Sequence, residues 1–193
     1  MEATPRIELG IELLQSSALT TWLRRPFAAQ ILLGCLDVSG EFKDAMAAVP
    51  AGVAVVAARD DGGLRGLTAT SFTSVSLDPP LVLVCLDRFA RTRDAVAASG
   101  RYTVSVLERG QEFVAERFAG RAPLVGPAWQ EIPHDVGESG LPIVRGCVAW
   151  FECVLRDLYP AGDHEIAVGE VTAAGRGPGE PLVLWDRAFW RLG

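Results

Sequence analysis

The chain has 193 residues, a length that fits one domain and leaves little room for two independent cores. Apolar residues make up 49% and charged residues 22%, which excludes a disordered chain. The net charge is -6, and no run of Lys or Arg exceeds the pair Arg24-Arg25, so the basic stripe that nucleic-acid binding needs is missing.

The four cysteines, Cys35, Cys85, Cys147 and Cys153, contain no C-x-x-C pair, and the chain has only two histidines. We therefore expect neither a zinc or redox dithiol site nor any other metal site. No apolar core precedes Ile11, and the longest apolar stretches fall far below the roughly 20 residues of a membrane span. These features predict a cytoplasmic protein without a secretory signal.

Residues 1–40 form a segment of their own. Apolar residues recur there at intervals of three and four, as on one face of broken helices, and Pro26 interrupts the run. We expect a helical N-terminal extension over 1–40, packed on the main body or at a dimer contact, followed by one domain over 41–193. The sequence does not indicate what the extension does.

Beyond residue 41 the pattern predicts a short helix and then mostly strands. The expected elements of the first half are a helix over 42–49, a buried strand over 53–58, an extended stretch over 64–76 and a strand buried on both faces over 81–86. The segment Asp60-Asp61-Gly62-Gly63 supplies a hairpin turn. The segment Asp78-Pro79-Pro80 ends the second strand, because proline cannot donate a ladder hydrogen bond.

The second half continues in the same manner. Its expected elements are a helix over 91–99 closed by Gly100, a half-buried strand over 102–106, a helix over 111–118, a long surface loop over 121–142, strands over 148–158 and 165–172, and a last extended stretch over 182–192. Strand spacings of about ten residues predict a mainly β fold, a closed or nearly closed antiparallel barrel with helices on its outside.

Several familiar catalytic motifs are absent from the sequence. The glycine clusters lie in expected hairpin turns, so none forms the G-x-G-x-x-G loop between a strand and a helix. The chain also has no G-x-S-x-G elbow, no P-loop and no H-E-x-x-H. A Rossmann dinucleotide site, a serine hydrolase and a zinc protease are unsupported.

The first candidate site is the strand around Thr68, which carries six hydroxyls in the nine residues 68–76. Hydroxyls and backbone N–H groups can donate to the carbonyls and N5 of an isoalloxazine ring and to a phosphate. The alternative is a half-exposed strand whose hydroxyls face water.

The second candidate is the start of the helix expected at Arg91. Free N–H groups at a helix N-terminus form a natural phosphate site, to which Arg91 and Thr92 would add a charged fork and a hydroxyl. The alternative is a capped helix with solvent-facing arginines.

The third candidate is His164, in the tight turn Ala161-Gly162-Asp163-His164. A lone histidine at a turn is more often a surface residue, and that reading also stays open. We assign His134, which has no such neighbourhood, to the surface.

Together these segments resemble the short-chain flavin reductase family, whose members supply reduced flavin to two-component monooxygenases. The resemblance runs from about residue 42 to residue 192. It is carried by residues 42–46, 52–53, 66–84, 102–107, 117–120 and by the glycine-aspartate-histidine turn at 162–164.

The resemblance implies an FMN-binding split barrel of Greek-key type, usually a homodimer with flavin near the subunit interface. It implies an enzyme that reduces FMN or FAD with NADH or NADPH and serves a flavin-dependent monooxygenase. His164 would face the nicotinamide. The implied flavin-binding residues are Thr68, Ala69, Thr70, Ser71, Ser74, Val75, Leu86, Asp87, Arg91, Thr92, Phe118, Gly162 and Asp163.

The sequence departs from the family's pattern in two places. Ala51 stands where the family often has Thr, and Thr70 where many members carry Asn or Ser, which leaves the choice between FMN and FAD open. Two other interpretations also remain. One is a split-barrel oxidoreductase like pyridoxamine-phosphate oxidase that retains its FMN, and the other is a flavin-binding protein without turnover.

Overall fold

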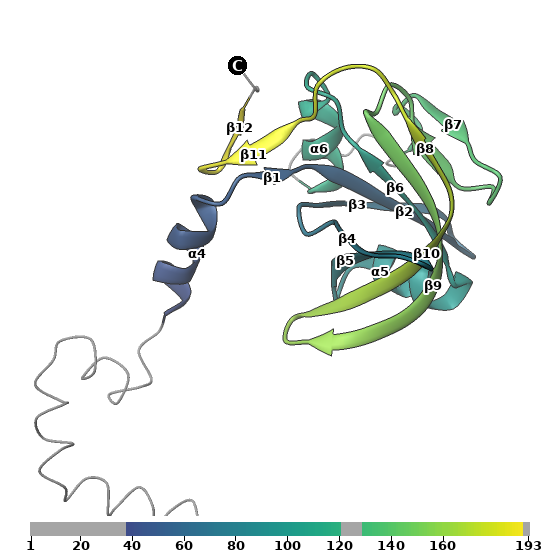
Figure 1. Ribbon diagram of the computed structural model, residues 1–193, viewed down its shortest axis with the longest axis horizontal. Helices are drawn as coiled ribbons and strands as arrows, with labels where there is room; N and C mark the ends of the chain where they lie inside the picture. Colours follow the sequence, from purple (N-terminus) through teal and green to yellow (C-terminus); the bar gives the residue numbers. More distant parts are fainter. Residues whose placement is uncertain (1–37, 121–128, 191–193) are drawn as a thin grey trace, which may run out of the picture. The chain divides into compact units, whose positions relative to one another are not determined.

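The computed structural model describes residues 38–120 and 129–190 of the chain (Figure 1). Two compact units divide it, Met1–Met46 and Ala47–Gly193. The described part of the first unit, residues 38–46, holds all but the last residue of helix α4, Ser39–Ala47, which begins three residues before the expected helix and has no buried residue. The expected extension over 1–40 lies almost entirely outside the described residues.

The second unit is built on a seven-stranded sheet in which every pairing is antiparallel. Its spatial order is β3-β2-β6-β9-β10-β5-β4. The strands are β2 (Ala54–Asp60), β3 (Gly63–Ala69), β4 (Thr73–Leu77), β5 (Pro80–Asp87), β6 (Arg101–Val106), β9 (Ala149–Ala161) and β10 (His164–Arg176).

This sheet curls until residues from its two halves share one core. Val56 of β2, Val84 of β5, Val104 of β6 and Ala167 of β10 belong to the same buried cluster. The edges β3 and β4 are not paired, so the barrel is open between them (Figure 1). Strands β9 and β10 separate the consecutive strands β5 and β6, a crossover of Greek-key type. The predicted mainly β, nearly closed barrel is confirmed.

Two helices flank the barrel. Helix α5 spans Arg91–Ser99 as predicted and ends at Gly100, whose left-handed φ of 64° lets its N–H bond to the carbonyl of Val96. Its residues Ala95 and Val96 are fully buried in the inner core. Helix α6 spans Glu112–Phe118.

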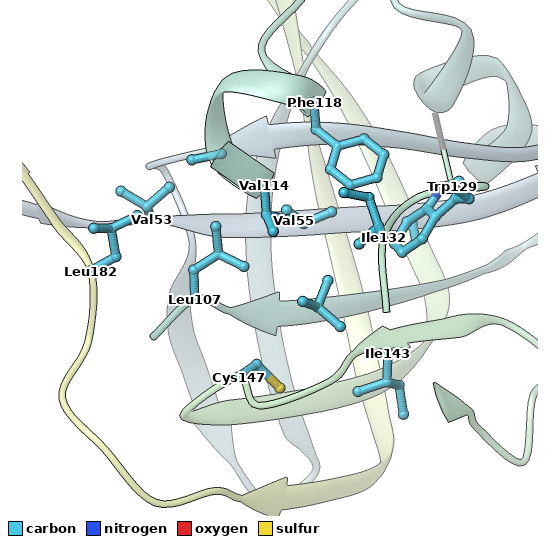
Figure 2. Packing of buried hydrophobic residues seen from close by; sticks show 13 residues of the cluster. Val53, Val55, Leu107, Val114, Phe118, Trp129, Ile132, Ile143, Cys147 and Leu182 are labelled. Atoms are coloured by element: carbon cyan, nitrogen blue, oxygen red, sulfur yellow. The ribbon is translucent and has the colours of Figure 1, made fainter. Parts of the chain in front are cut away.

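A second core lies on the other face of β2. Side chains alternate from Val53, just before the strand, into β2, so that Val53 and Val55 face this cluster while Ala54 and Val56 face the barrel interior. Figure 2 shows Val114 and Phe118 of α6 packed over it together with Trp129 and Ile132. Leu182 closes it beside the small sheet formed by β1 (Ala51–Gly52), β11 (Val183–Trp185) and β12 (Ala188–Trp190).

The expected surface loop over 121–142 is wrong for the part that the structure describes. Trp129, Ile132 and Leu141 are buried, with exposed fractions of 4%, 3% and 4%. Strands β7 (His134–Val136) and β8 (Pro142–Val144) pair to form a small two-stranded sheet. Proline and glycine punctuate this stretch and obscure the few apolar side chains that hold it on the core. Residues 121–128 lie outside the described residues.

Strand β6 is buried on both faces, whereas the alternation predicts only one. Residues 142–144 cover its second face: Thr103 Oγ1 donates to the carbonyl of Pro142 at 2.7 Å, and Ser105 Oγ accepts from the N–H of Val144 at 3.0 Å. Burying a hydroxyl costs little free energy when it is hydrogen-bonded to the backbone. Polar residues in this strand therefore do not indicate exposure to solvent.

Strand β5 shows the opposite error, because only one of its faces is fully buried. Val82, Val84 and Leu86 are buried, while Leu81, Leu83 and Cys85 are half-exposed. The expected stretch over 64–76 is also divided into β3 and β4, with a break at residues 70–72 where the chain crosses the open side of the barrel.

Within residues 38–120 and 129–190, no helix is long and apolar enough to span a membrane. The same residues contain no group of three or more His, Cys, Asp or Glu side chains arranged to hold a metal ion. Cys85, Cys147 and Cys153 are free thiols. Burial raises the pKa of Cys153 to about 12, so this thiol stays protonated at neutral pH.

Candidate functional site

A cleft of about 1190 Å³ opens along strand β3 of the second unit. Its walls are β3 itself, the passage from β5 into α5, the end of α6, the segment from Trp129 to His134, and His164 at the start of β10. These segments are distant in sequence. The curled sheet brings them together on one side of the barrel.

Most of the residues predicted to bind cofactor or nicotinamide line this cleft. They are Thr68, Ala69, Thr70, Ser71, Asp87, Arg91, Thr92, Phe118 and His164. The three candidate segments identified separately in the sequence therefore form one cavity.

Strand β3 forms the floor, and one hydroxyl in the strand and one just after it bond to neighbouring elements. Thr68 Oγ1 donates to the carbonyl of Ala115 in α6 at 2.7 Å, which ties the helix to the strand. Ser71 Oγ accepts from the N–H of Cys85 in β5 at 2.9 Å, across the open side of the barrel. These two hydroxyls hold the walls together, whereas Thr70 is exposed and has no such bond to another described residue.

Gly66 lets α6 approach this strand closely. A Cβ built at Gly66 would lie 2.6 Å from the ring of Phe118 and 3.1 Å from Nε1 of Trp129. Any side chain at this position would therefore displace the aromatic residues that close one end of the cleft.

The N-terminus of α5 faces the cleft without a side-chain cap. Ala90 occupies the N-cap position with an extended backbone and makes no capping side-chain hydrogen bond. The first N–H groups of the helix and its positive dipole end are thus available to an anion. The Arg91 side chain is exposed and makes no hydrogen bond or short ion pair with another described residue, although its charge acts on Asp60, and Thr92 is 4% exposed.

His164 stands opposite Asp87 in the ladder between β10 and β5, which places it at the same end of the cleft as α5. The preceding turn needs Gly162 because its φ of 69° is left-handed. Nδ1 of His164 lies 2.8 Å from Oδ1 of Asp163. This contact lowers the pKa of the Asp163 carboxyl below its usual value.

The remaining predicted residues do not line the cleft. Leu86 is fully buried in the core inside the barrel, so its side chain does not line the cleft, and its assignment as a flavin contact stays a prediction. Ser74 and Val75 lie on the exposed edge strand β4. Gly162 and Asp163 form the turn before His164. Of these three residues, His164 lines the cleft.

Other lining residues were missed by sequence reasoning, above all Trp129, Gln130 and His134. The Trp129 ring lies 4.6 Å from that of Phe118 and 5.3 Å from that of His134, measured between centroids, and its Nε1 donates to the carbonyl of Arg65 at 3.0 Å. His134 is therefore a cleft residue and not a plain surface residue. In the sequence, the one feature that indicates this part of the cleft is Trp129, a large apolar residue in an otherwise polar stretch.

Arg65 also lines the cleft, but its charge is already partnered. Its Nε donates to Oδ2 of Asp60 at 2.8 Å across the β2–β3 hairpin. The same hydrogen bond lowers the pKa of the Asp60 carboxyl. Arg91 is thus the lining arginine that is left for an anionic ligand.

The chemistry available in the cleft is binding and orientation. One wall offers an uncapped helix end with an arginine, another a strand carrying hydroxyls, and the third an exposed histidine. This set suits a planar ligand with an anionic tail, with a second molecule near His164.

Residues 46–193 match the flavin reductase like domain. The reductase component of 4-hydroxyphenylacetate 3-monooxygenase from Thermus thermophilus is 44% identical over 152 residues, covering 78% of this chain and 95% of that protein. The structure of the NADH:FAD oxidoreductase SgcE6 from Streptomyces globisporus superposes with a TM-score of 0.76 at 38% identity, covering 82% of this chain and 95% of that one.

A further structure of SgcE6 contains NAD and FAD fragments. It superposes with a TM-score of 0.74 at 38% identity and covers 80% of this chain and 93% of that one. The match over residues 46–193, the identities and the shared architecture lead to one conclusion: the chain belongs to the flavin reductase like family, whose split-barrel fold it has.

Proposed function

We propose that this protein is an NAD(P)H:flavin oxidoreductase that reduces FMN or FAD with a hydride from NADH or NADPH. The observation that carries the proposal is that one cleft joins the hydroxyl-bearing strand β3, the uncapped N-terminus of α5 and His164. The names of the similar proteins support it, since they include an NADH:FAD oxidoreductase and the reductase component of a monooxygenase.

The described residues fit a flavin phosphate at the end of the cleft next to α5. The first N–H groups of the helix would donate to a phosphate, and the guanidinium of Arg91 would add a charge-assisted donor. Thr92 adds a hydroxyl from the same turn. Ala90 at the N-cap has no side-chain cap, while the Asp87 carboxylate accepts from the N–H of Phe89 at 2.7 Å, one residue before it.

The isoalloxazine ring would lie along β3, where Thr68, Ala69 and Thr70 line the cleft. Because the Thr68 hydroxyl already donates to Ala115, β3 would contact the ring mainly through its backbone, and Thr70, directly after the strand, would add its hydroxyl. Phe118 is buried against Trp129, so it would shape the end of the ring pocket without stacking on the flavin.

A bound flavin supplies the hydride acceptor, and the nicotinamide supplies the hydride, so neither needs a protein acid or base. The chain's own residues hold the two planar molecules in contact, which can lower the barrier by several kcal/mol. His164 would orient the nicotinamide carboxamide or screen a phosphate. Its exposed position suits a binding contact better than proton transfer.

The test is steady-state oxidation of NADH by the full chain with FMN or FAD in large molar excess. The proposal predicts many turnovers per protein and a rate that saturates with free flavin. A rate indifferent to added flavin would instead indicate a retained-flavin oxidase of the pyridoxamine-phosphate-oxidase kind. Quenched flavin fluorescence without NADH oxidation would indicate a carrier. Repeating the assay with NADPH decides the donor.

In the cell the reduced flavin would pass to a flavin-dependent monooxygenase, as the name of the Thermus protein suggests for that protein. The reaction would take place in the cytoplasm, where the nicotinamide pool is held. The chain would divide into a helical extension over 1–40 and a flavin reductase domain over 41–193.

The active form would be a homodimer that buries the half-exposed face of β5 and β10. Leu83 stands opposite Val168 and Cys85 opposite Ile166 on these paired strands, which gives a continuous apolar face. The adjacent edge strand β4 leaves Val75 and Leu77 exposed at 50% and 94%. Ser74 and Val75 do not line the cleft of their own subunit. In such a dimer they would contact a flavin bound by the other subunit.

A further inference from the structure

Arg88 ties the turn before His164 to the segment that leads into α5. Its backbone N–H donates to the carbonyl of Asp163 at 3.1 Å, and its Nη1 donates to the carbonyl of Gly162 at 3.3 Å. Both acceptors belong to the tight turn between β9 and β10. One arginine therefore holds the two peptide groups that precede the histidine.

A second arginine holds the residue that follows the histidine. Nε of Arg93, in the first turn of α5, donates to Oε2 of Glu165 at 2.6 Å, and Nη2 donates to Oε1 at 2.6 Å. Glu165 is 6% exposed, and the fork of Arg93 lowers the pKa of its carboxyl. A bidentate pair of this kind fixes orientation as well as distance.

The contact of His164 with Asp163 cannot fix the imidazole to the same degree. The side chain of Asp163 is 87% exposed and that of His164 is 44% exposed. Ion pairs so open to water contribute little. The position of His164 depends instead on the backbone on both sides of it, which the two arginines hold.

We propose that Arg88, Arg93 and Glu165 are positioning residues for the reduction of flavin. They fix His164 relative to the first turn of α5, so that the helix end that binds the flavin phosphate and the histidine that faces the nicotinamide form one rigid unit. None of the three lines the cleft, so each acts through His164. The inference rests on the proposed function for its effect on the reaction.

The test uses two variants of the full chain, Arg88→Ala and Glu165→Gln. Arg88 is exposed, so its loss leaves the core untouched, whereas Glu165→Gln removes the charge of a buried pair while keeping its shape. The matched controls are Arg109→Ala and Glu180→Gln. They break an ion pair of 2.8 Å whose side chains are about half exposed and lie outside the cleft.

We expect each test variant to raise the KM for NADH about 3- to 10-fold, as expected for one weakened hydrogen bond. Because the helix end stays intact, the Kd for flavin should remain within about twofold of the unmodified value. The controls should change neither quantity. Conservative replacement Arg93→Lys keeps the charge but loses the fork, and it should raise the KM less than Glu165→Gln.

A second readout does not depend on activity. The chain has two histidines, so the imidazole resonances of the ligand-free protein are resolved by NMR and assigned with His164→Asn. If Arg88, Arg93 and Glu165 hold His164 in place, His164 gives one sharp resonance. This resonance should shift or broaden in Arg88→Ala and Glu165→Gln but not in the controls. If Glu165→Gln does not fold, Arg88→Ala decides.

The two hypotheses fail separately. A chain that never oxidises NADH with any flavin would contradict the proposed function. The His164 resonance would still show whether Arg88, Arg93 and Glu165 hold the histidine in place. Folded test variants that keep both the His164 resonance and the KM of the unmodified protein would overturn the positioning role.

Discussion

At the scale of single residues, His164 differs from a usual catalytic histidine. It is partly exposed, its near partner is the exposed carboxylate of Asp163, and within residues 38–120 and 129–190 no buried carboxylate bonds to its ring. Hydride transfer between two planar cofactors needs no proton relay, so the role proposed for His164, a binding contact with the nicotinamide, is sufficient.

Replacing His164 with alanine therefore tests a binding role. We expect the KM for NADH to rise about 3- to 10-fold because a hydrogen bond to the dinucleotide is lost. The affinity for flavin, measured by fluorescence quenching, should change little. Kinetics identical to those of the unmodified protein would make His164 an ordinary solvent-exposed turn residue.

Glu152 is a buried carboxylate that serves structure. It is 2% exposed and accepts hydrogen bonds from the hydroxyl and the N–H of Ser139 and from the N–H of Glu138, which pin the turn between β7 and β8 onto β9. Burial alone would raise its pKa, but these hydrogen bonds outweigh burial and lower it.

This lowered pKa makes a pH-dependent contribution to stability. The contribution is fully present above the pKa of glutamate in the unfolded chain, about 4.3, and is lost as the pH falls through the lower pKa of the folded protein. We expect Glu152→Gln to reduce the free energy of unfolding by about 1–3 kcal/mol at neutral pH.

Urea denaturation at several pH values measures this difference, which should shrink as the medium becomes acidic. Glu138→Gln removes an exposed carboxylate in the same turn and serves as the control, with little effect expected at any pH. A deficit for Glu152→Gln that is constant down to pH 3 would contradict the account.

At the scale of elements, the uncapped N-terminus of α5 is the proposed phosphate site, and strand β3 is the proposed site of the flavin ring. FMN carries a phosphate and riboflavin does not. Arg91→Ala should weaken FMN binding about tenfold, the loss of one charge-assisted contact at a partly exposed site. Riboflavin binding should be unaffected, and both affinities follow from fluorescence titration.

Equal losses for FMN and riboflavin would mean that Arg91 contacts the ring end or supports the fold. No loss for either would place the phosphate elsewhere. The ligand pair is an internal control, since the same variant and the same cleft are compared.

Local signals were enough to predict α5 and the β9–β10 turn. Helix α5 carries its own stop at Gly100, and Gly162 marks the tight turn. The hydroxyl-rich strand and His164 were identified because their residue types are unusual for their positions. These features need no knowledge of what packs on them.

The errors arise where burial depends on a distant segment. Thr103 and Ser105 suggest an exposed face until residues 142–144 cover it. Trp129 and His134 reach the cleft only because their segment folds back over α6 and β3. Neither contact leaves a periodic pattern in the sequence, so residues 129–142 resemble a surface loop.

At the scale of the whole molecule, the open side of the barrel and the half-exposed face of β5 and β10 lead to the proposed homodimer. We expect Leu77→Asp, on the adjacent edge strand, to weaken self-association at least tenfold in analytical ultracentrifugation. A charge there would be buried in the interface. Flavin-dependent NADH oxidation should fall with it.

Val136→Asp is the matched control because Val136 is also exposed, at 69%, but lies on β7 away from that face. It should leave the dimer intact. An unmodified chain that sediments as a monomer at every concentration would remove the dimer from the account.

The central claim is that one cleft holds flavin and nicotinamide in direct contact, so that a hydride passes between them without a protein acid or base. Anaerobic stopped-flow mixing of the flavin-loaded chain with NADH tests it most directly. We predict that the yellow flavin absorbance bleaches at a rate that saturates with NADH and varies little between pH 6 and pH 8. Flavin that binds but stays oxidised in the presence of excess NADH and NADPH would contradict the claim.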